Sequence, residues 1–370
     1  MVATLEPGKF AGAAPSCSYG RVMPTSSPGR FAIDLPAGRL ATCDRLADQH
    51  AGLRERGVHH RDGGWVIARP PDVTAALASP ALTVAAVDPR GGPPAGDARR
   101  LQARMARFCD FPQHAHRREL VELLLPDVPG LQAAAAQRTA AGLRDRTGVF
   151  DVMPLARTVP VAVLAAALGV PAAKLTPVAI LVGRLCDALA PSLSPLYADP
   201  GDGDEAACEL MAALAAVGLW DDEQVAAAAG LLFQARDATA ALVGAALLAE
   251  QARADRDAAA SIGWALRHDA PVQCTRRTAV VDVQLGGVTV PRGAPVWVVV
   301  AAAEEGPPSQ PATFGAGPHA CPAAAHAVAV ACGVLSALRT DAWQLVPGQP
   351  VGYEPRPNLR LPAAVLVQRP

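Results

Sequence analysis

The sequence predicts a mainly α-helical protein with small β-sheets at its margins. Three observations support this class. Alanine is abundant while aromatic residues make up only 4% of the 370 residues, and alanine has the highest helix propensity of all residues. Helical segments broken by prolines follow one another from His114 to Trp220. Alternating and β-branched stretches are short and lie before and after this helical region.

The elements expected outside the region 114–220 can be placed in chain order. The chain is irregular up to about Pro36, and glycine and proline mark loops near residues 88–97, 199–204 and 306–311. The expected elements are a helix at 40–56, a strand at 64–68, a helix at 71–78, a long helix at 222–256, a hairpin at 279–290, a strand at 296–300, a helix at 322–339 and a strand pair within 359–368.

The longest predicted helix, over residues 222–256, is apolar on nearly every face. Aspartates at its start suit the positive end of the helix dipole. About 30 helical residues extend roughly 45 Å, enough to cross the molecule. A helix that is apolar all round belongs in the interior, so we expect it at the centre of the fold.

Composition and charge exclude several classes of function. The net charge of -1 gives no long-range attraction to nucleic acid or to an anionic membrane. No uncharged apolar run reaches the roughly 18 residues of a membrane span, and the N-terminus lacks a signal-peptide pattern. The eight cysteines are scattered, as expected for reduced thiols. We therefore expect a cytoplasmic protein that forms a single domain over residues 1–370.

The segment TFGAGPHACPAAAHAVA is the most informative in the chain. Gly315 and Gly317 permit tight turns and the close approach of the backbone to a flat ligand. Pro322 suits the first position of a helix, which places Cys321 at the helix N-terminus. Unpaired backbone N–H groups and the helix dipole are expected to stabilise a thiolate there. Such a thiolate can ligate iron, whereas the simpler interpretation is a loop with a buried cysteine.

This segment resembles the haem-binding signature of the cytochrome P-450 superfamily, Phe-x-x-Gly-x-(His/Arg)-x-Cys-x-Gly. Phe314, Gly317, His319 and Cys321 match in register, and Ala323 replaces the last glycine. The resemblance extends from about residue 40 to the C-terminus and is to the soluble, actinobacterial type. It implies the cytochrome P-450 fold, haem b as the cofactor and Cys321 as the axial ligand to its iron.

Two further segments resemble the family where it binds the haem propionates. FPQHAHRRELV matches a His-x-x-x-Arg segment and gives His114 and Arg118, one helical turn apart. CTRRTAVVDVQLGGVTVP matches a strand whose propionate-binding arginine is Arg277. His319 is expected to be a further donor. Each of these could singly be a solvated surface residue, but charge-assisted hydrogen bonds from all four to two carboxylates are sound chemistry.

The family's structural ion-pair network is missing from the sequence. In GWALRHDAPV the family's Glu-x-x-Arg motif keeps Arg267 but has Trp264 in place of the glutamate. The segment EEGPPSQPAT before the cysteine loop is short and holds no arginine or histidine to complete the network. We expect Arg267 to bond backbone carbonyls instead and haem to be held more loosely than is usual in the family.

The central helix also departs from the family's oxygen-binding pattern, (Ala/Gly)-Gly-x-(Asp/Glu)-Thr. In LLFQARDATAALVG, Asp237 keeps the acid but Ala238 replaces the threonine. Thr239 is a candidate substitute, although it lies about 100° further round the helix. Asp237 is either a proton relay or a helix acid paired with Arg236.

The resemblance leaves three functions open. The first is a monooxygenase that tailors a natural-product intermediate and receives electrons from ferredoxin and ferredoxin reductase. The second is a haem-thiolate enzyme of other chemistry, such as oxidative cyclisation, coupling, rearrangement or dehydration, which the altered central helix favours. The third is a catalytically silent partner of another biosynthetic enzyme. Cys321 argues against the third function, and the missing ion-pair network argues for it. In each enzymatic case Cys321, Asp237 and Thr239 are the candidate catalytic residues and the substrate is a small molecule.

Overall fold

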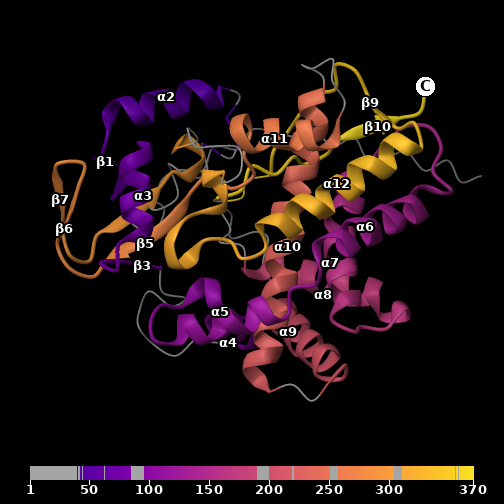
Figure 1. The fold of residues 1–370 in the computed structure, drawn as a ribbon, viewed down its shortest axis with the longest axis horizontal. Coiled ribbons are helices and arrows are strands. Elements are labelled where there is room, and N and C mark those ends of the chain that lie inside the picture. The colour runs from indigo at the N-terminus through magenta and orange to yellow at the C-terminus, as the bar shows by residue number, and fades with distance from the viewer. Residues whose placement is uncertain are drawn as a thin grey trace, which may run out of the picture.

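A computed structural model describes residues 40, 42–43, 45–61, 63–84, 96–189, 200–218, 221–250, 257–303, 311–354, 356 and 358–370. The predicted irregular segment 1–36, most of the loop 88–97 and the segment 306–310 lie outside these residues. Two regions are visible in Figure 1, a sheet with α2 and α3 beside it and a larger helical region. The described helices are α2 Leu46–Arg56, α3 Pro70–Ala78, α4 Asp97–Arg104, α5 Gln113–Leu123, α6 Val128–Leu143, α7 Met153–Ala167, α8 Leu175–Leu189, α9 Pro200–Ala215, α10 Asp222–Ala249, α11 Ala258–His268 and α12 Ala324–Thr340.

The strands form three small sheets. The largest has the order β1-β2-β8-β5-β3, in which β2 and β8 are parallel and the other neighbours are antiparallel. The second has the order β4-β10-β9, and β6 and β7 form the predicted hairpin. The strands are β1 His59–Arg61, β2 Gly64–Ile67, β3 Leu82–Val84, β4 Phe150–Asp151, β5 Thr275–Ala279, β6 Val283–Leu285, β7 Val288–Val290, β8 Pro295–Val298, β9 Gln344–Leu345 and β10 Leu366–Gln368.

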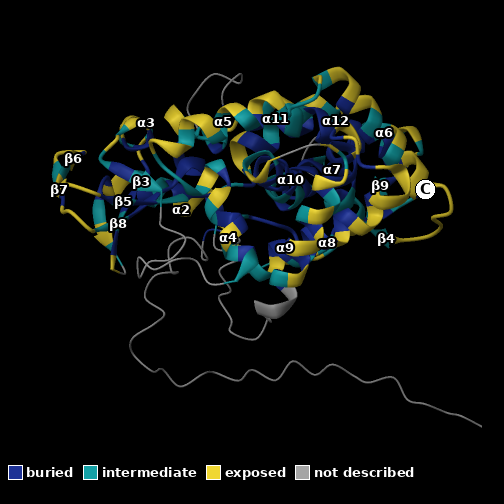
Figure 2. Cartoon of the chain, turned by 90° about the horizontal axis from the view of Figure 1, so that it is seen from below, coloured by how far each residue is buried: buried dark blue, intermediate teal, exposed yellow. Residues whose placement is uncertain are grey.

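Helix α10 is the central element, as the sequence predicts. It begins in a capping box, in which the Asp221 carboxylate accepts from the backbone of Gln224 at 2.8 Å and the Gln224 side chain accepts from the Asp221 backbone at 3.0 Å. In Figure 2 the helix lies in the interior between α11 and α12 on one side and α8 and α9 on the other. By length and hydropathy both α10 and the stretch 317–340 could cross a membrane, but 67% of the apolar window of α10 is buried in the fold.

Helix α12 lies against α6, where a glycine allows close contact. A Cβ at Gly333 would lie 2.4 Å from the carbonyl oxygen of Gln132 and 2.8 Å from the Cβ of Ala135. The two helix backbones can therefore approach only because this position has no side chain. This packing fixes the helix that follows the cysteine loop.

Several predicted boundaries are wrong. The predicted helix at 40–56 is interrupted, since Leu40 and Thr42 are helical but α2 begins only at Leu46, and the predicted loop at 199–204 is the first turn of α9 from Pro200. Helix α10 ends at Ala249, and α12 begins at Ala324, so that Pro322 lies in a turn before the helix. These errors lie at element ends, where capping and tertiary packing outweigh the hydrophobic pattern.

Candidate functional site

The cysteine loop, residues 311–323, is built from two short 3₁₀ helices and two glycine turns. The 3₁₀ helices are η5 Ala312–Phe314 and η6 Gly317–His319. Gly315 and Gly317 have φ of 74° and 67°, a conformation that other residues rarely adopt. The backbone N–H of Cys321 donates to the carbonyl of Phe314 at 2.8 Å, which closes the loop over the cysteine. The predicted tight turns are confirmed.

Gly317 makes a close approach, but to protein backbone. A Cβ at this position would lie 2.7 Å from the carbonyl oxygen of Leu77 and 3.3 Å from the Cα of Ala78. These atoms belong to the C-terminal end of α3. In this structure the glycine therefore seats the cysteine loop on α3.

The protonation of Cys321 differs from the expectation. Burial raises the pKa of the Cys321 thiol, although the backbone of Ala323 and the charges of Arg107 and Arg118 lower it. The residue as a whole is exposed, but its surroundings desolvate the sulfur enough to dominate. The predicted stabilisation of the thiolate is present, but the effect of burial on the pKa is larger. The neutral thiol is therefore favoured until a metal replaces the proton.

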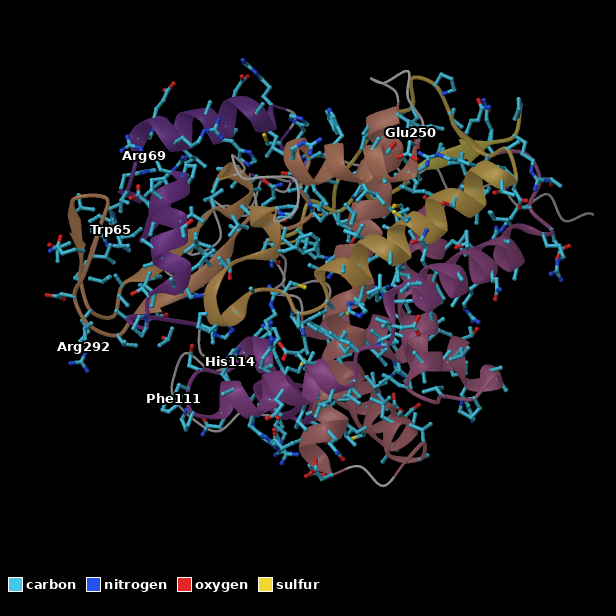
Figure 3. All side chains as sticks on the ribbon, viewed as in Figure 1. Trp65, Arg69, Phe111, His114, Glu250 and Arg292 are labelled. Atoms are coloured by element: carbon cyan, nitrogen blue, oxygen red, sulfur yellow. The ribbon has the colours of Figure 1, made fainter. Side chains whose placement is uncertain are left out.

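The two predicted histidines meet beside the cysteine loop. The rings of His114, on α5, and His319 lie 4.1 Å apart between centroids and are tilted by 47°. His319 Nε2 lies 3.4 Å from Asp110 Oδ1. Burial lowers the pKa of His319 to about 4, with the charges of His114 and Arg277 acting in the same direction. Figure 3 shows His114 on α5, on the side that faces the cysteine loop. Neutral imidazoles here can donate one N–H each.

Arg277 is the third predicted donor and is buried on β5, with 5% of its surface exposed. Its Nη1 donates to the Thr275 hydroxyl at 2.7 Å and to the backbone of Arg276 at 2.9 Å. Burial, assisted by the charge of Arg107, lowers the pKa of Arg277 to about 10. Within the described part of the chain no carboxylate pairs with this guanidinium.

Arg118, the fourth predicted donor, is already engaged. Its Nε pairs with Glu122 at 2.6 Å, and its Nη1 donates to the carbonyls of Pro318, at 3.2 Å, and Ala320. Arg118 therefore fastens the residue before Cys321 to α5. Its position next to the cysteine is as predicted, but in this structure it holds the loop rather than facing an open site.

An apolar cavity of about 40 Å³ lies between the central helix and the cysteine loop. Ala238 and Leu242 line it from α10, and Phe314 lines it from the cysteine loop. Its remaining lining residues are Leu266, Pro271, Val272, Thr313 and Ala327. The face of α10 that carries Ala238 is therefore the face directed at the cysteine loop, as the alignment with the family's threonine predicts.

Asp237 lies among cations rather than facing this cavity. Arg236 Nη1 is 2.6 Å from its Oδ1, and Arg356 Nη2 is 3.6 Å from its Oδ2. Arg157, on α7, lies 4.0 Å away and also pairs with Glu354. The simpler interpretation, a paired helix acid, is thus supported for Asp237. Thr239 is buried, at 3% exposure.

The expected substitute for the missing ion-pair network is wrong. Arg267 is exposed and makes no hydrogen bond or ion pair with a described residue, while Trp264 stacks on His268 with ring centroids 4.8 Å apart. A different buried pair lies next to it. Asp269, directly after α11, pairs with Arg360 of the C-terminal segment, and Arg360 also donates to the carbonyl of Cys43 at 2.9 Å. This pair joins α11 to the chain termini of the fold.

Comparisons with known proteins agree with this geometry. No family model matches the sequence. The cytochrome P-450 monooxygenase DoxA of a Streptomyces species (strain C5) is 37% identical over a match that covers 27% of this chain and 29% of that protein. Among solved structures, P450BioI in complex with an acyl carrier protein ligated to hexadec-9Z-enoic acid has a TM-score of 0.75 at 19% identity, over 90% of this chain and all of that one. Epothilone B-bound cytochrome P450epoK has a TM-score of 0.71 at 20% identity, over 90% and 98%.

These findings define the class of the protein: a mainly α-helical protein with the cytochrome P-450 fold. The fold that the resemblance of the cysteine segment implies is therefore confirmed.

The residues fit the haem that this fold implies. A loop cysteine and neighbouring cations with too few carboxylates match the iron and the two propionates of haem, and apolar side chains of α10 and the cysteine loop lie beside them. Sequence reasoning missed two charged residues of this group, the cation Arg107 and the anion Asp110. Asp110 could have been found, because it lies directly before the segment FPQHAHRRELV and four residues before His114, whereas nothing in the sequence distinguishes Arg107 from other arginines.

Proposed function

We propose that this protein is a haem-thiolate oxidoreductase that holds haem b through Cys321. One observation carries the proposal: Cys321 ends a two-turn loop that Gly317 seats on α3 and Arg118 fastens to α5. A cysteine held from two sides, beside the buried Arg277 that pairs with no described carboxylate, is more than a buried thiol needs. When bound, the haem iron would supply redox and oxygen chemistry, and the thiolate would donate electron density to it.

The chain's own residues would have distinct roles around that group. Cys321 gives its proton to solvent when it binds iron. Arg277, His319 and His114 can donate to the propionates, with Arg118 supporting the loop. The apolar walls from α10 and the cysteine loop exclude water from the space between them.

We further propose monooxygenation of a natural-product intermediate by a bacterial cytoplasmic enzyme, with electrons from ferredoxin and ferredoxin reductase. The similarity to a Streptomyces P-450 monooxygenase and to a P-450 that binds epothilone B supports this proposal. The single domain over residues 1–370 and the looser haem retention expected from Trp264 belong to the same proposal. Transfer of haem to excess apomyoglobin measures retention, and very slow transfer would contradict the expectation.

The carbon monoxide difference spectrum of the reduced protein tests the role of Cys321. We expect the wild type to give the strongly red-shifted Soret band of thiolate ligation and Cys321→Ala to lose it. Cys332→Ala, on α12, is the matched control, because Cys332 is half-buried on the helix that follows the loop. A protein that stays colourless with added haem, or a red-shifted band that survives Cys321→Ala, would refute the proposal. The colourless result would favour the silent partner.

A specific observation favours a second reaction type. Ala238 lines the cavity where the family's threonine hydroxyl would lie, and Asp237 is tied into an ion-pair group. The side chains that would manage protons for dioxygen are thus absent or engaged, which suits oxidative cyclisation, coupling, rearrangement or dehydration. Turnover of a candidate substrate without any electron donor would support this alternative and exclude ordinary monooxygenation.

A further inference from the structure

The middle of helix α10 is less buried than the stretches on either side of it. Residues 225–232 and 239–247 are all buried. A helix that is apolar on nearly every face should be buried along its whole length. Between the two stretches, however, several residues are only half-buried, namely Phe233, Gln234, Ala235, Arg236 and Ala238. The packing around α10 therefore opens at this point.

Gln234 is the polar residue of this opening that keeps a hydrogen-bonding group unused. Arg236 and Asp237 pair with each other at 2.6 Å. The Nε2 of Gln234 donates to the carbonyl of Gly230, one turn earlier, at 3.0 Å. Its Oε1 accepts no hydrogen bond from a described residue, and because the carboxamide is planar this oxygen points away from the Gly230 bond. Gln234 therefore presents a free acceptor.

The turn of α10 that holds this side chain is fixed by the segment before α5. A Cβ on Gly230 would lie 3.0 Å from Met105 Cγ, so methionine and glycine are in close contact. Phe108, in the short helix η1 Ala106–Phe108, meets Phe233 edge-to-face with ring centroids 6.4 Å apart. Both the carbonyl that anchors the Gln234 amide and the backbone next to Gln234 are therefore held in place.

Gln234 lies on the face of α10 that is directed at the cysteine loop. It precedes Ala238 by four residues, and residues at this spacing share one face of a helix. Ala238 lines the apolar cavity together with Phe314 of the cysteine loop. Gln234 lies beyond that cavity, one turn or roughly 6 Å nearer the start of α10. The family's pattern has alanine or glycine at this position, so the carboxamide is a departure of this chain. This face thus lacks the hydroxyl at position 238 and carries an acceptor one turn earlier.

We propose that Gln234 determines substrate specificity, with its Oε1 accepting a hydrogen bond from a hydroxyl group of the substrate. This inference rests on the proposed function, because it places the substrate between α10 and a haem held by Cys321. A carbonyl oxygen that loses water on substrate binding needs a donor in return, and the neighbouring Ala235 and Ala238 offer none. The substrate class is therefore a largely apolar molecule that carries a hydroxyl.

The test uses N-hydroxyalkyl imidazoles of graded chain length and the corresponding methyl ethers. The imidazole nitrogen binds the iron of the holoprotein and gives a spectral titration, so each chain presents its oxygen at a different distance. The alcohol can donate a hydrogen bond to Gln234 and the ether cannot. At one or more chain lengths we expect Gln234→Leu to lower the ratio of alcohol affinity to ether affinity about fivefold, as for one hydrogen bond.

The affinity ratio separates contact with the ligand from a change in the shape of the site. A variant that only reshapes the site alters the binding of alcohol and ether alike, whereas loss of the acceptor weakens the alcohol alone. Gln234→Met is a second variant with an unbranched side chain, and we expect the same fall in the ratio from it. Gln137→Leu is the matched control, because Gln137 is exposed on α6 and should leave the ratio unchanged.

The outcomes separate the two proposals. A wild type that takes up no haem, or whose haem lacks thiolate ligation, refutes the proposed function and the role of Gln234 together. A thiolate-ligated holoprotein in which Gln234→Leu or Gln234→Met has the wild-type ratio at every chain length refutes the role of Gln234 alone. A fall in the ratio that Gln137→Leu also produces refutes it as well.

Discussion

Two groups of arginines in this molecule differ in how their charge is balanced. In the group around the central helix, three arginines meet three carboxylates. Its members are Arg157, Arg236 and Arg356 with Asp187, Asp237 and Glu354. In the group beside the cysteine loop, neither buried Arg277 nor exposed Arg107 forms an ion pair with a described residue, and Asp110, the carboxylate that acts on Arg277, also lies 3.4 Å from His319.

The pKa directions express the same difference. Burial alone would lower the pKa of Arg356, but Asp237, Asp187 and Glu354 together raise it above its ordinary value. For Arg277 burial dominates and lowers the pKa to about 10. The first group is complete within the protein and serves to hold α7, α8 and α10 to the C-terminal segment. The second group lacks negative charge, which is what a site for an anionic ligand requires.

The largest expected effect is the loss of a cation from the balanced group. Arg356→Met leaves Asp237 and Asp187 without their shared partner, at 3.6 and 2.7 Å. Breaking a buried ion pair from one side costs about 3–5 kcal/mol, and because Asp237 keeps Arg236 we expect the free energy of unfolding of the apoprotein in urea to fall by the lower end of that range, about 3 kcal/mol. Arg45→Met is the control, because its pair with Asp48 is fully at the surface and should matter by less than about 0.5 kcal/mol. A loss below 1 kcal/mol for Arg356→Met would mean that the group is not a structural unit.

The sequence predicts a feature well when the residues that mark it lie close together in the chain. The central helix, the hairpin and the cysteine loop are visible in the sequence because composition, paired glycines and a fixed spacing mark them. His114, Arg277 and His319 are found through the same spacing, and the structure brings them together. Arg107 is missed because its significance comes from what is absent around it, and a missing counter-ion has no sequence signature.

The partners of correctly placed residues are the other limit. Asp237 and Arg118 lie where the family's pattern puts them. Their roles depend on their ion-pair partners, which are Arg356 for Asp237 and Glu122 for Arg118. Arg356 is more than a hundred residues from Asp237, so no local pattern connects them. The Asp269–Arg360 pair is equally non-local, so no local pattern predicts it.

A second prediction concerns His50, a buried base that, unlike arginine, can lose its proton. Burial lowers the pKa of His50 from 6.5 to about 4, against the effect of its hydrogen bond with Gln273 at 3.0 Å. As the pH falls from 6.5 to 4, the unfolded chain binds this proton before the folded chain does, so stability that is complete above pH 6.5 is lost across that window. The loss attributable to His50 is about 3 kcal/mol.

His50→Gln keeps a donor toward Gln273 but cannot titrate. We therefore expect urea unfolding of this variant to lose about 3 kcal/mol less than the wild type between pH 7 and pH 4. Equal losses would show that His50 is protonated in the folded protein without cost. The expected result would show that this fold keeps a buried histidine neutral. Buried arginines, in contrast, stay charged because they cannot lose their proton.

The smallest expected effect, and the most direct comparison of the two groups, is the loss of a cation from the unbalanced one. Arg277→Met should leave the apoprotein at least as stable as the wild type, because no described carboxylate loses a partner. It should release haem about ten times faster, the equivalent of about 1.4 kcal/mol. Arg276→Met is the control on the same strand, where the guanidinium lies 5.8 Å from the centre of the Trp297 ring instead. Arg277→Met could instead destabilise the apoprotein as much as Arg356→Met does. Both arginine groups would then be structural, and groups of the protein rather than a ligand would have to balance the charge beside the cysteine loop.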